Sequence, residues 1–384
     1  MTPLTLGFMP LLDSAVLVAA AEYGFAAAEG LELTLMRESS WANIRDRTLI
    51  GHFEAAHMLG PMPLASTLGI GHVRVPMIAP LALGLGGNAV TVSAKLWAEM
   101  TLRGASIGAS PAMQGAALKD VLGARARSGQ EVLTFGMVYP FSCHNYELRY
   151  WLAGCGIDPD RDVRLVVIPP PFLVDAMRAG EIDGFCVGEP WNSVAVEAGV
   201  GVIAAATTAI WPHSAEKVLG CREDWAQRHP QVLGALIRAL YRSALWCADP
   251  LNHVPLARTL AEPRYVGSPA ALLLRSLTHR LVLAPRASAH EVADFFVTAR
   301  HAATYPWASH ALWFYSQMVR WRQLEASDES RAQARGTYRP DLYRAALEPL
   351  GAELPRGEEK IERFFDGEIF DPADLAAYVR RRRH

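Results

Sequence analysis

Short apolar runs alternate with helix-like runs through the first half of the chain, and this alternation narrows the choice of fold more than any other property. Runs of this length fit β-strands, and glycines such as Gly24 and Gly51 stand where the intervening helices would end. The strand candidates are residues 4–8, 31–36, 55–65, 131–140 and 163–171, the third of which breaks into a proline-rich loop. This order predicts an α/β fold with largely parallel sheets.

A second block of strands and helices opens near residues 83–97, and from about residue 200 onward the pattern becomes mostly helical. Neither a repeat of fixed period nor a low-complexity linker separates the blocks. We therefore expect two α/β lobes that are joined by short crossings and leave a cleft between them. Ligands prefer such domain interfaces and the carboxyl ends of parallel strands.

Composition and short motifs exclude several classes of function. The formal net charge of -2 gives no electrostatic reason to expect direct binding to nucleic acid or to an anionic membrane. Five scattered cysteines without C-x-x-C, and twelve histidines without metal-ligand spacing, argue against a disulfide framework and a metal site. Residues 84–89 (GLGGNA) lack the third glycine of a dinucleotide fingerprint, so no cofactor is expected. No nucleophile elbow, phosphate-binding loop or HExxH motif indicates an enzyme.

The N-terminal residues indicate the cellular compartment in which the protein is expected. The first strand candidate follows Met1 almost at once, without a basic segment, an apolar segment or a small-residue cleavage site. No run of eighteen apolar residues occurs in the sequence. These observations predict a soluble, cytoplasmic protein.

Residues 183–192 (DGFCVGEPWN) contain the first candidate for a binding site. An apolar strand over residues 185–187 ends at Gly188, and Pro190 follows two residues later. This pattern fits an ordinary turn. It fits equally a glycine that leaves its backbone N–H bare at the edge of a cleft, where a small anion could accept a hydrogen bond.

Three further side chains are candidates for the same cleft. Trp41 stands at a predicted helix N-terminus, where free N–H groups and the helix dipole favour an anion, although a core aromatic fits the pattern as well. His144 begins another predicted helix. Lys217 lies in HSAEKVLG, near the start of a helical run, where a surface lysine is the simpler interpretation.

Long motifs carry a resemblance to a known family. They are SWANIRDRTLIG, AAHMLGPMPLA, HNYELRYWLAGCGIDPDRDVRLVVIPPP, DGFCVGEPWN, HSAEKVLG and YPWASHALWFYSQMVRW. Together they resemble the nitrate- and bicarbonate-binding proteins of ABC transporters, and the cytosolic NasS-type nitrate/nitrite sensor of that family. The resemblance implies a two-lobed fold like that of the periplasmic binding proteins. It places lobe I in residues 1–85 plus 203–384 and lobe II in residues 86–202.

The resemblance also implies a ligand set. In the nitrate-binding relatives a tryptophan, an amide, a histidine, a glycine N–H and a lysine hold the ion between the lobes. By motif these fall on Trp41, Asn88, His144, Gly188 and Lys217, with asparagine standing where the relatives carry the longer glutamine. In the bicarbonate-binding relatives a glutamate and a calcium ion replace the lysine. Lys217 therefore favours nitrate or nitrite, and the neighbouring Glu216 would reverse that preference if the alignment slipped by one residue.

Nitrate is a planar, singly charged acceptor that has no proton to donate. It needs several N–H donors and one positive charge in a site that excludes water. Lys217 would supply the charge, and the tryptophan, amide, histidine and glycine would supply donors. No metal ion or other cofactor is required.

Three roles are compatible with these residues. The leading hypothesis is a cytoplasmic nitrate/nitrite sensor, which the resemblance implies would hold an RNA-binding antiterminator of the ANTAR type and release it when the anion binds. The second is the substrate-binding component of a nitrate or bicarbonate ABC transporter. The third is an enzyme on the same scaffold, as in relatives that make thiamine or menaquinone precursors, for which the sequence shows no catalytic motif.

Overall fold

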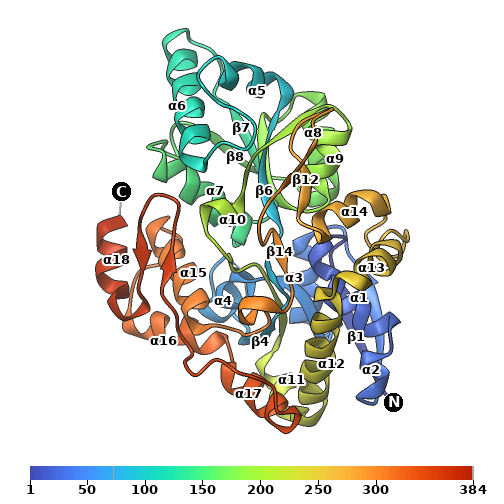
Figure 1. Ribbon diagram of the computed structural model, residues 1–384. Helices are drawn as coiled ribbons and strands as arrows, with labels where there is room; N and C mark the ends of the chain where they lie inside the picture. Colours follow the sequence, from blue (N-terminus) through green and yellow to red (C-terminus); the bar gives the residue numbers. More distant parts are fainter. Residues whose placement is uncertain (72, 383–384) are drawn as a thin grey trace.

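The computed structural model describes residues 1–71 and 73–382, and it confirms the expected two-lobed α/β architecture. Each lobe is built around a five-stranded sheet. In Figure 1 the lobe that contains β6 and β7 lies above the lobe that contains β1 and β4. Strand β1 and the C-terminal helix α18 (Leu375–Arg382) both lie beside the lower lobe, so the second lobe is inserted between two parts of the first.

The first sheet has the strand order β2-β1-β3-β11-β4. Its strands are β1 (Thr2–Phe8), β2 (Leu31–Arg37), β3 (Ala55–Leu59), β4 (Met77–Ala82) and β11 (Lys217–Arg222). Strand β1 is parallel to β2 and β3, whereas β11 is antiparallel to β3 and β4.

Helices cover both faces of the first sheet. One group shares a hydrophobic core with Leu6 of β1: α1 (Ala15–Glu22), α12 (Pro230–Ala248), α13 (His253–Leu260), α14 (Ala270–Leu277) and α17 (Pro340–Leu347). A second group shares a core with Met58 of β3: α3 (Trp41–Leu49), α4 (Pro61–Leu68), α15 (Ala308–Arg320) and α16 (Asp328–Thr337). The first sheet is thus buried between two helical layers, as the sequence of alternating elements predicts.

The second sheet has the strand order β10-β6-β9-β7-β8. Its strands are β6 (Asn88–Ser93), β7 (Thr134–Met137), β8 (Arg164–Val167), β9 (Gly184–Gly188) and β10 (Gly201–Ala206). The helices of this lobe are α5 (Ala94–Thr101), α6 (Pro111–Arg127), α7 (Cys143–Gly154), α8 (Leu173–Ala179) and α9 (Trp191–Glu197). Strand β7 is parallel to β8 and β9, and β6 is antiparallel to β9 and β10.

Local signals in the sequence set several element ends. Ser40 caps α3, where its hydroxyl accepts a hydrogen bond of 3.2 Å from the N–H of Asn43. Gly24 and Gly51 have φ values of 81° and 78°, a left-handed conformation that glycine adopts without steric cost. The helices therefore begin and end close to the residues that the sequence indicated.

Three expectations about local structure are wrong. The sheets are mixed rather than largely parallel, because β6 and β11 carry the chain into and out of the second lobe against the direction of their neighbours. The expected proline-rich loop after β3 is helix α4, because Pro61 occupies the first helical position, where its missing N–H costs nothing. Lys217 begins strand β11 instead of lying near a helix start, because the apolar residues after it are buried between β3 and β4.

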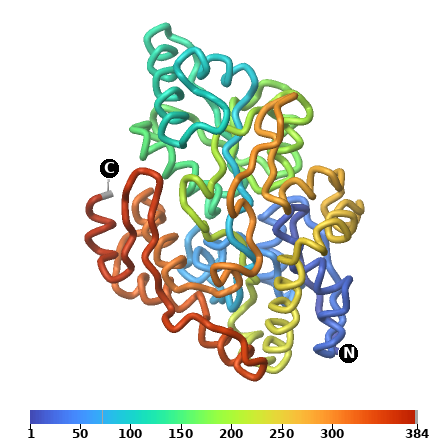
Figure 2. Tube along the Cα trace, viewed as in Figure 1, coloured from blue at the N-terminus to red at the C-terminus, as the bar shows by residue number. Residues whose placement is uncertain are grey.

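Three chain segments run between the lobes side by side. Strand β5 (Leu85–Gly86) pairs antiparallel with β14 (Phe296–Val297), and Leu85 forms a β-bridge with Ala215. The segment before β14 contains β12 (Arg280–Val282) and β13 (Ala289–Glu291), and it reaches the second lobe, where Leu283 accepts a hydrogen bond from the N–H of Ile203. Figure 2 shows this segment in orange beside the green strands of that lobe.

The C-terminal part of the chain packs against the first lobe. The hairpin of β15 (Glu362–Arg363) and β16 (Ile369–Phe370) leads to α18 (Leu375–Arg382), which contacts α15. Among the described residues, no helix has both the length and the apolar character that a bilayer crossing demands.

Candidate functional site

The five side chains or backbone groups that the sequence analysis selected lie together between the lobes. Trp41 begins α3, and Lys217 begins β11, both in the first lobe. Asn88 begins β6, His144 lies in the first turn of α7, and Gly188 ends β9, all in the second lobe. Trp41, Asn88, His144 and Lys217 are each at most 1% exposed. The lobes are therefore closed over these residues, whose role in binding stays a prediction.

Lys217 is the centre of this site. Its ammonium group lies 2.8 Å from Oδ2 of Asp13, forms an ion pair with Glu216, and stands 5.6 Å from the centroid of the Trp41 ring. Burial alone lowers the pKa of Lys217, but the charges of Asp13 and Glu216 outweigh it and raise that pKa above its ordinary value. Lys217 is thus a buried, permanently charged cation at the boundary between the lobes.

Asp13 and His57 hold the first-lobe side of Lys217. Burial acts to raise the pKa of Asp13, but Lys217 and His57 outweigh it and hold the pKa of this carboxyl far below its usual range. The Nε2 atom of His57 lies 2.9 Å from Oδ1 of Asp13, while its Nδ1 accepts a hydrogen bond from the N–H of Met9. Because burial lowers the pKa of His57, the ring is neutral and carries its proton on Nε2, facing Asp13.

His144 approaches the lysine from the second lobe. Its Nε2 lies 3.2 Å from Oε1 of Glu216, and both of its ring nitrogens lack a well-oriented hydrogen-bond partner among the described residues. Burial, helped by the charge of Lys217, lowers the pKa of His144 well below its ordinary value. A neutral, buried imidazole without a partner carries a desolvation cost, which a ligand that accepts its N–H would remove.

Asn88 and Gly188 form the floor of the site. They are paired residues of the antiparallel strands β6 and β9. The amide nitrogen of Asn88 donates a 3.0 Å hydrogen bond to Glu147, and its oxygen has no partner in the described part of the chain. A methyl group on Gly188 would lie 3.2 Å from Oδ1 of Asn88 and 3.4 Å from Oδ2 of Asp13. A side chain at Gly188 would therefore crowd the amide of Asn88 in the same lobe and would only touch Asp13 of the other lobe.

Two glutamates make the charge of the site dependent on pH. Burial, followed by the charge of Glu216, raises the pKa of Glu147 to about 8, so Glu147 is mainly protonated at neutral pH. Burial also raises the pKa of Glu216, although Lys217 opposes this shift. In its protonated form a carboxyl group donates an O–H instead of repelling an anion. The site thus holds one fixed cation, one fixed carboxylate and two carboxyls whose pKa values burial raises.

Trp41 adds an unused donor. Its indole N–H has no hydrogen-bond partner among residues 1–71 and 73–382, and its ring packs edge-on against His57, with 5.4 Å between the ring centroids. The same hydrophobic core contains Trp41 and Met58 of the first lobe and Phe135 and Phe185 of the second. The donor is therefore held rigidly at the point where the lobes meet.

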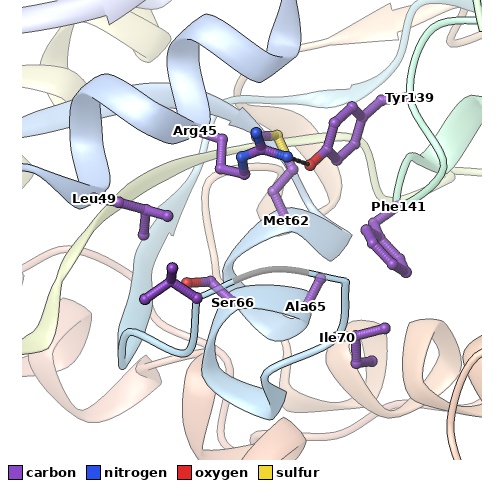
Figure 3. Close-up of a pocket in the computed structure, with 9 residues that line it drawn as sticks. Arg45, Leu49, Met62, Ala65, Ser66, Ile70, Tyr139 and Phe141 are labelled. Atoms are coloured by element: carbon purple, nitrogen blue, oxygen red, sulfur yellow. Dashed lines mark hydrogen bonds between the residues drawn. The ribbon is translucent and has the colours of Figure 1, made fainter.

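A polar contact also joins the two lobes one helical turn after Trp41 on α3. Figure 3 shows Arg45 of α3 reaching toward Tyr139 of the second lobe, and the guanidinium donates a 2.8 Å hydrogen bond to the tyrosine hydroxyl. Beneath this bond a hollow of about 20 Å³ is lined by both lobes, with Met62 and Phe141 among its walls. That volume is about the room that one water molecule needs.

Three residues of this cluster were not among the candidates from the sequence. Asp13 stands just before the first helix, and its side chain points into the site and pairs with Lys217. His57 interrupts an otherwise apolar strand, and Glu147 interrupts the buried face of α7. A polar residue inside a buried apolar run was the available signal for both, because such a group needs a partner.

Comparison with known proteins places these residues in a familiar setting. The profile of the NMT1-like family matches residues 1–261. The nitrate/nitrite binding protein NrtA of Synechococcus elongatus is 33% identical over 98% of this chain and 85% of its own length. The bicarbonate-binding protein CmpA of the same strain is 29% identical over 97% of this chain and 85% of its own length.

Two further matches concern Synechocystis. The nitrate import ATP-binding protein NrtC is 37% identical over 98% of this chain, which spans about half (55%) of the length of NrtC. The crystal structure of the periplasmic nitrate-binding protein NrtA superposes on this chain with a TM-score of 0.92, at 28% identity, covering 100% of this chain and 99% of that one. The two-lobed fold of this chain is therefore the fold of the periplasmic nitrate-binding protein NrtA.

Proposed function

Because the chain belongs to the NMT1-like family, whose members matched here include nitrate- and bicarbonate-binding proteins of ABC transporters, we propose that it binds nitrate or nitrite between its lobes. One observation carries the proposal. Lys217, a buried cation at the lobe boundary, lies among N–H donors that have no well-oriented hydrogen-bond partner in the described part of the chain. These donors are the indole of Trp41 and the imidazole of His144.

The chemistry of the site favours nitrate over bicarbonate bound with calcium. The ammonium of Lys217 lies between Asp13 and Glu216. It therefore takes the position between two carboxylates that a calcium ion would need. A single cation of fixed charge and several N–H donors suit an acceptor that has no proton. Glu147 supports the same ligand, because burial raises its pKa and its protonated form offers an O–H as a further donor.

Calorimetry with nitrate, nitrite, bicarbonate with and without calcium, and sulfate tests the ligand. We expect nitrate or nitrite to bind, and Lys217→Ala to abolish binding. The matched control is Lys95→Met, which changes an exposed lysine outside the cluster and should leave affinity unchanged. Absence of nitrate and nitrite binding at millimolar concentration would refute the ligand assignment, and unchanged affinity in Lys217→Ala would refute the site.

The proposed role of this binding is sensing in the cytoplasm. In the ligand-free state the protein holds an RNA-binding antiterminator of the ANTAR type, and nitrate or nitrite releases it. The resemblance of the long sequence motifs to NasS-type sensors supports this role, and a two-lobed protein offers the two states that such a switch needs. To move the partner from mostly bound to mostly free, the anion must favour one state by about 5.5 kcal/mol.

The alternative role is delivery of the anion to a membrane transporter, which the names of the matched transport proteins favour. Two measurements separate the roles. Cell fractionation of the source organism gives the location, and the sensor role requires the cytoplasmic fraction. Affinity capture with immobilised protein should retain an ANTAR-domain protein without nitrate and release it with nitrate, and retention that ignores nitrate would refute the sensor role.

A further inference from the structure

A second cluster of polar side chains lies outside the anion site. Nε2 of His213 and Nε2 of His301 are each 3.1 Å from the same atom, Oδ2 of Asp294. The two imidazole rings are stacked, with 3.8 Å between their centroids. The three ligand-type atoms lie within 4.8 Å of one another. Because His213 is 81 residues away from Asp294 in the sequence, no motif of short spacing predicts the cluster.

The geometry of the cluster fits a transition metal ion. Two donor atoms that are 3.1 Å apart and each about 2.1 Å from an ion subtend about 95° at that ion, which is within the range of a distorted tetrahedral site. Two imidazoles and one carboxylate form a ligand set that zinc and similar divalent ions prefer to calcium or magnesium. The side chains of His213, Asp294 and His301 are 32%, 24% and 40% exposed, so an ion has a path from solvent and a free fourth position.

Neighbouring groups hold the carboxylate in place. Arg300 donates a 2.6 Å hydrogen bond to Oδ1 of Asp294, which leaves Oδ2 directed at the two histidines. A hydrogen bond to the second oxygen of a ligating carboxylate is the usual support for a metal ligand. His213, Asp294 and His301 also have left-handed backbones, with φ values of 56°, 50° and 58°. Such conformations are uncommon outside glycine and persist where the surrounding structure fixes them.

The cluster sits where the segments between the lobes meet. Next to His213, the carbonyl of Ser214 accepts a hydrogen bond from the N–H of Gly86, and next to Asp294, the carbonyl of Phe295 accepts one from the N–H of Gly87. Strand β14, which follows Asp294, is labelled at the centre of the molecule in Figure 1, between the lobes. His213 also precedes Lys217 by four residues. An ion here would cross-link the crossing segments beside the anion site.

We propose that His213, Asp294 and His301 form a binding site for a divalent transition metal ion of the zinc type, with one position open to water. The site goes beyond anion binding and does not depend on it. Without an ion, two histidines share one carboxylate oxygen, and an exposed cluster of that kind contributes little to stability. With an ion, the segment around His213 is tied to the segment that contains Asp294 and His301.

The experiment uses the full, untagged chain after treatment with a chelator. Zinc chloride is titrated in competition with a chromophoric chelator, with magnesium and calcium chloride as separate titrations. We expect one equivalent of zinc at micromolar affinity or tighter, no comparable binding of magnesium or calcium, and a higher Tm in zinc. Failure of the protein to bind a stoichiometric equivalent of zinc at 100 μM (about 100 times the expected Kd) would overturn the proposal.

Variants distinguish this site from the cysteines and from other histidines. His213→Asn and His301→Asn remove a ligand but keep a side chain that tolerates a left-handed backbone, and each should weaken zinc binding by at least about 100-fold. His290→Ala changes an exposed histidine outside the cluster and should leave the affinity unchanged. Circular dichroism and nitrate titration show whether each variant is folded. Zinc affinity that is the same in a folded His301→Asn variant as in the unchanged protein would overturn the site.

Discussion

Replacement of Lys217 by methionine tests the electrostatic account of the site most directly. Methionine keeps much of the volume and removes the charge, so Asp13 is left as a buried carboxylate without its cation. At an effective dielectric constant of about 20, two unit charges 2.8 Å apart attract each other by about 6 kcal/mol. Most of that attraction offsets the cost of burying the two groups, and breaking such a pair costs about 3–5 kcal/mol.

Asp13 has one way to escape this cost, which is to take up a proton. Adding a proton at pH 7 to a carboxyl with an ordinary pKa of about 3.9 costs about 4 kcal/mol. We therefore expect Lys217→Met to lower the free energy of unfolding by about 4 kcal/mol at pH 7. The pKa of Asp13 in the folded variant is then raised above its unfolded value, so the folded state binds the extra proton. The loss should shrink by about 1.4 kcal/mol for each pH unit between pH 7 and pH 5.

Urea unfolding followed by circular dichroism measures this loss. The double variant Asp13→Asn with Lys217→Met should recover most of the 4 kcal/mol (about 3 kcal/mol or more), because Asp13 no longer brings a buried carboxylate to the site. Lys95→Met, at an exposed lysine, should change the free energy of unfolding by less than about 0.5 kcal/mol. A loss below about 1 kcal/mol in Lys217→Met, or a loss that does not depend on pH, would show that the lysine and Asp13 are not a buried ion pair.

Three other outcomes concern the anion. Nitrate affinity should fall as pH rises through about 8, because Glu147 then ionises beside Lys217, Glu216 and Asn88. The Glu147→Gln variant should show a flatter dependence of nitrate affinity on pH in calorimetry. An unchanged dependence in that variant would exclude Glu147 as its source. Trp41→Phe keeps the ring and removes the indole N–H, so it should weaken nitrate binding by about 10- to 100-fold with little change in Tm, whereas equal affinity would place the anion away from the indole. Tyr139→Phe removes the hydroxyl that accepts a hydrogen bond from Arg45 across the two lobes. The Kd for nitrate should rise by about 2- to 5-fold, through faster dissociation of nitrate in stopped-flow measurements. An unaltered dissociation rate would show that this bond does not hold the lobes closed.

Much of the candidate site was accessible from the sequence because its residues mark element ends. Trp41 follows a serine cap, His144 opens a helix, and Gly188 ends a strand before a proline, and each such feature is local. The resemblance to nitrate-binding proteins then added Asn88 and linked the motifs into one site. The helix at Pro61 was missed because the proline pattern fits a loop and a helix start equally well.

The sequence by itself determined the alternation of strands and helices, the glycine-marked ends of those elements, and the two-lobed class of the fold, since these depend on neighbouring residues and on apolar periodicity. Only the tertiary structure decided that Asp13 and Glu216 flank Lys217, that burial raises the pKa of Glu147, and that His213, Asp294 and His301 meet. Charge, pKa and coordination depend on distances of a few ångströms between segments far apart in the chain. Closure of the two lobes sets those distances, and closure is a property of the packed molecule.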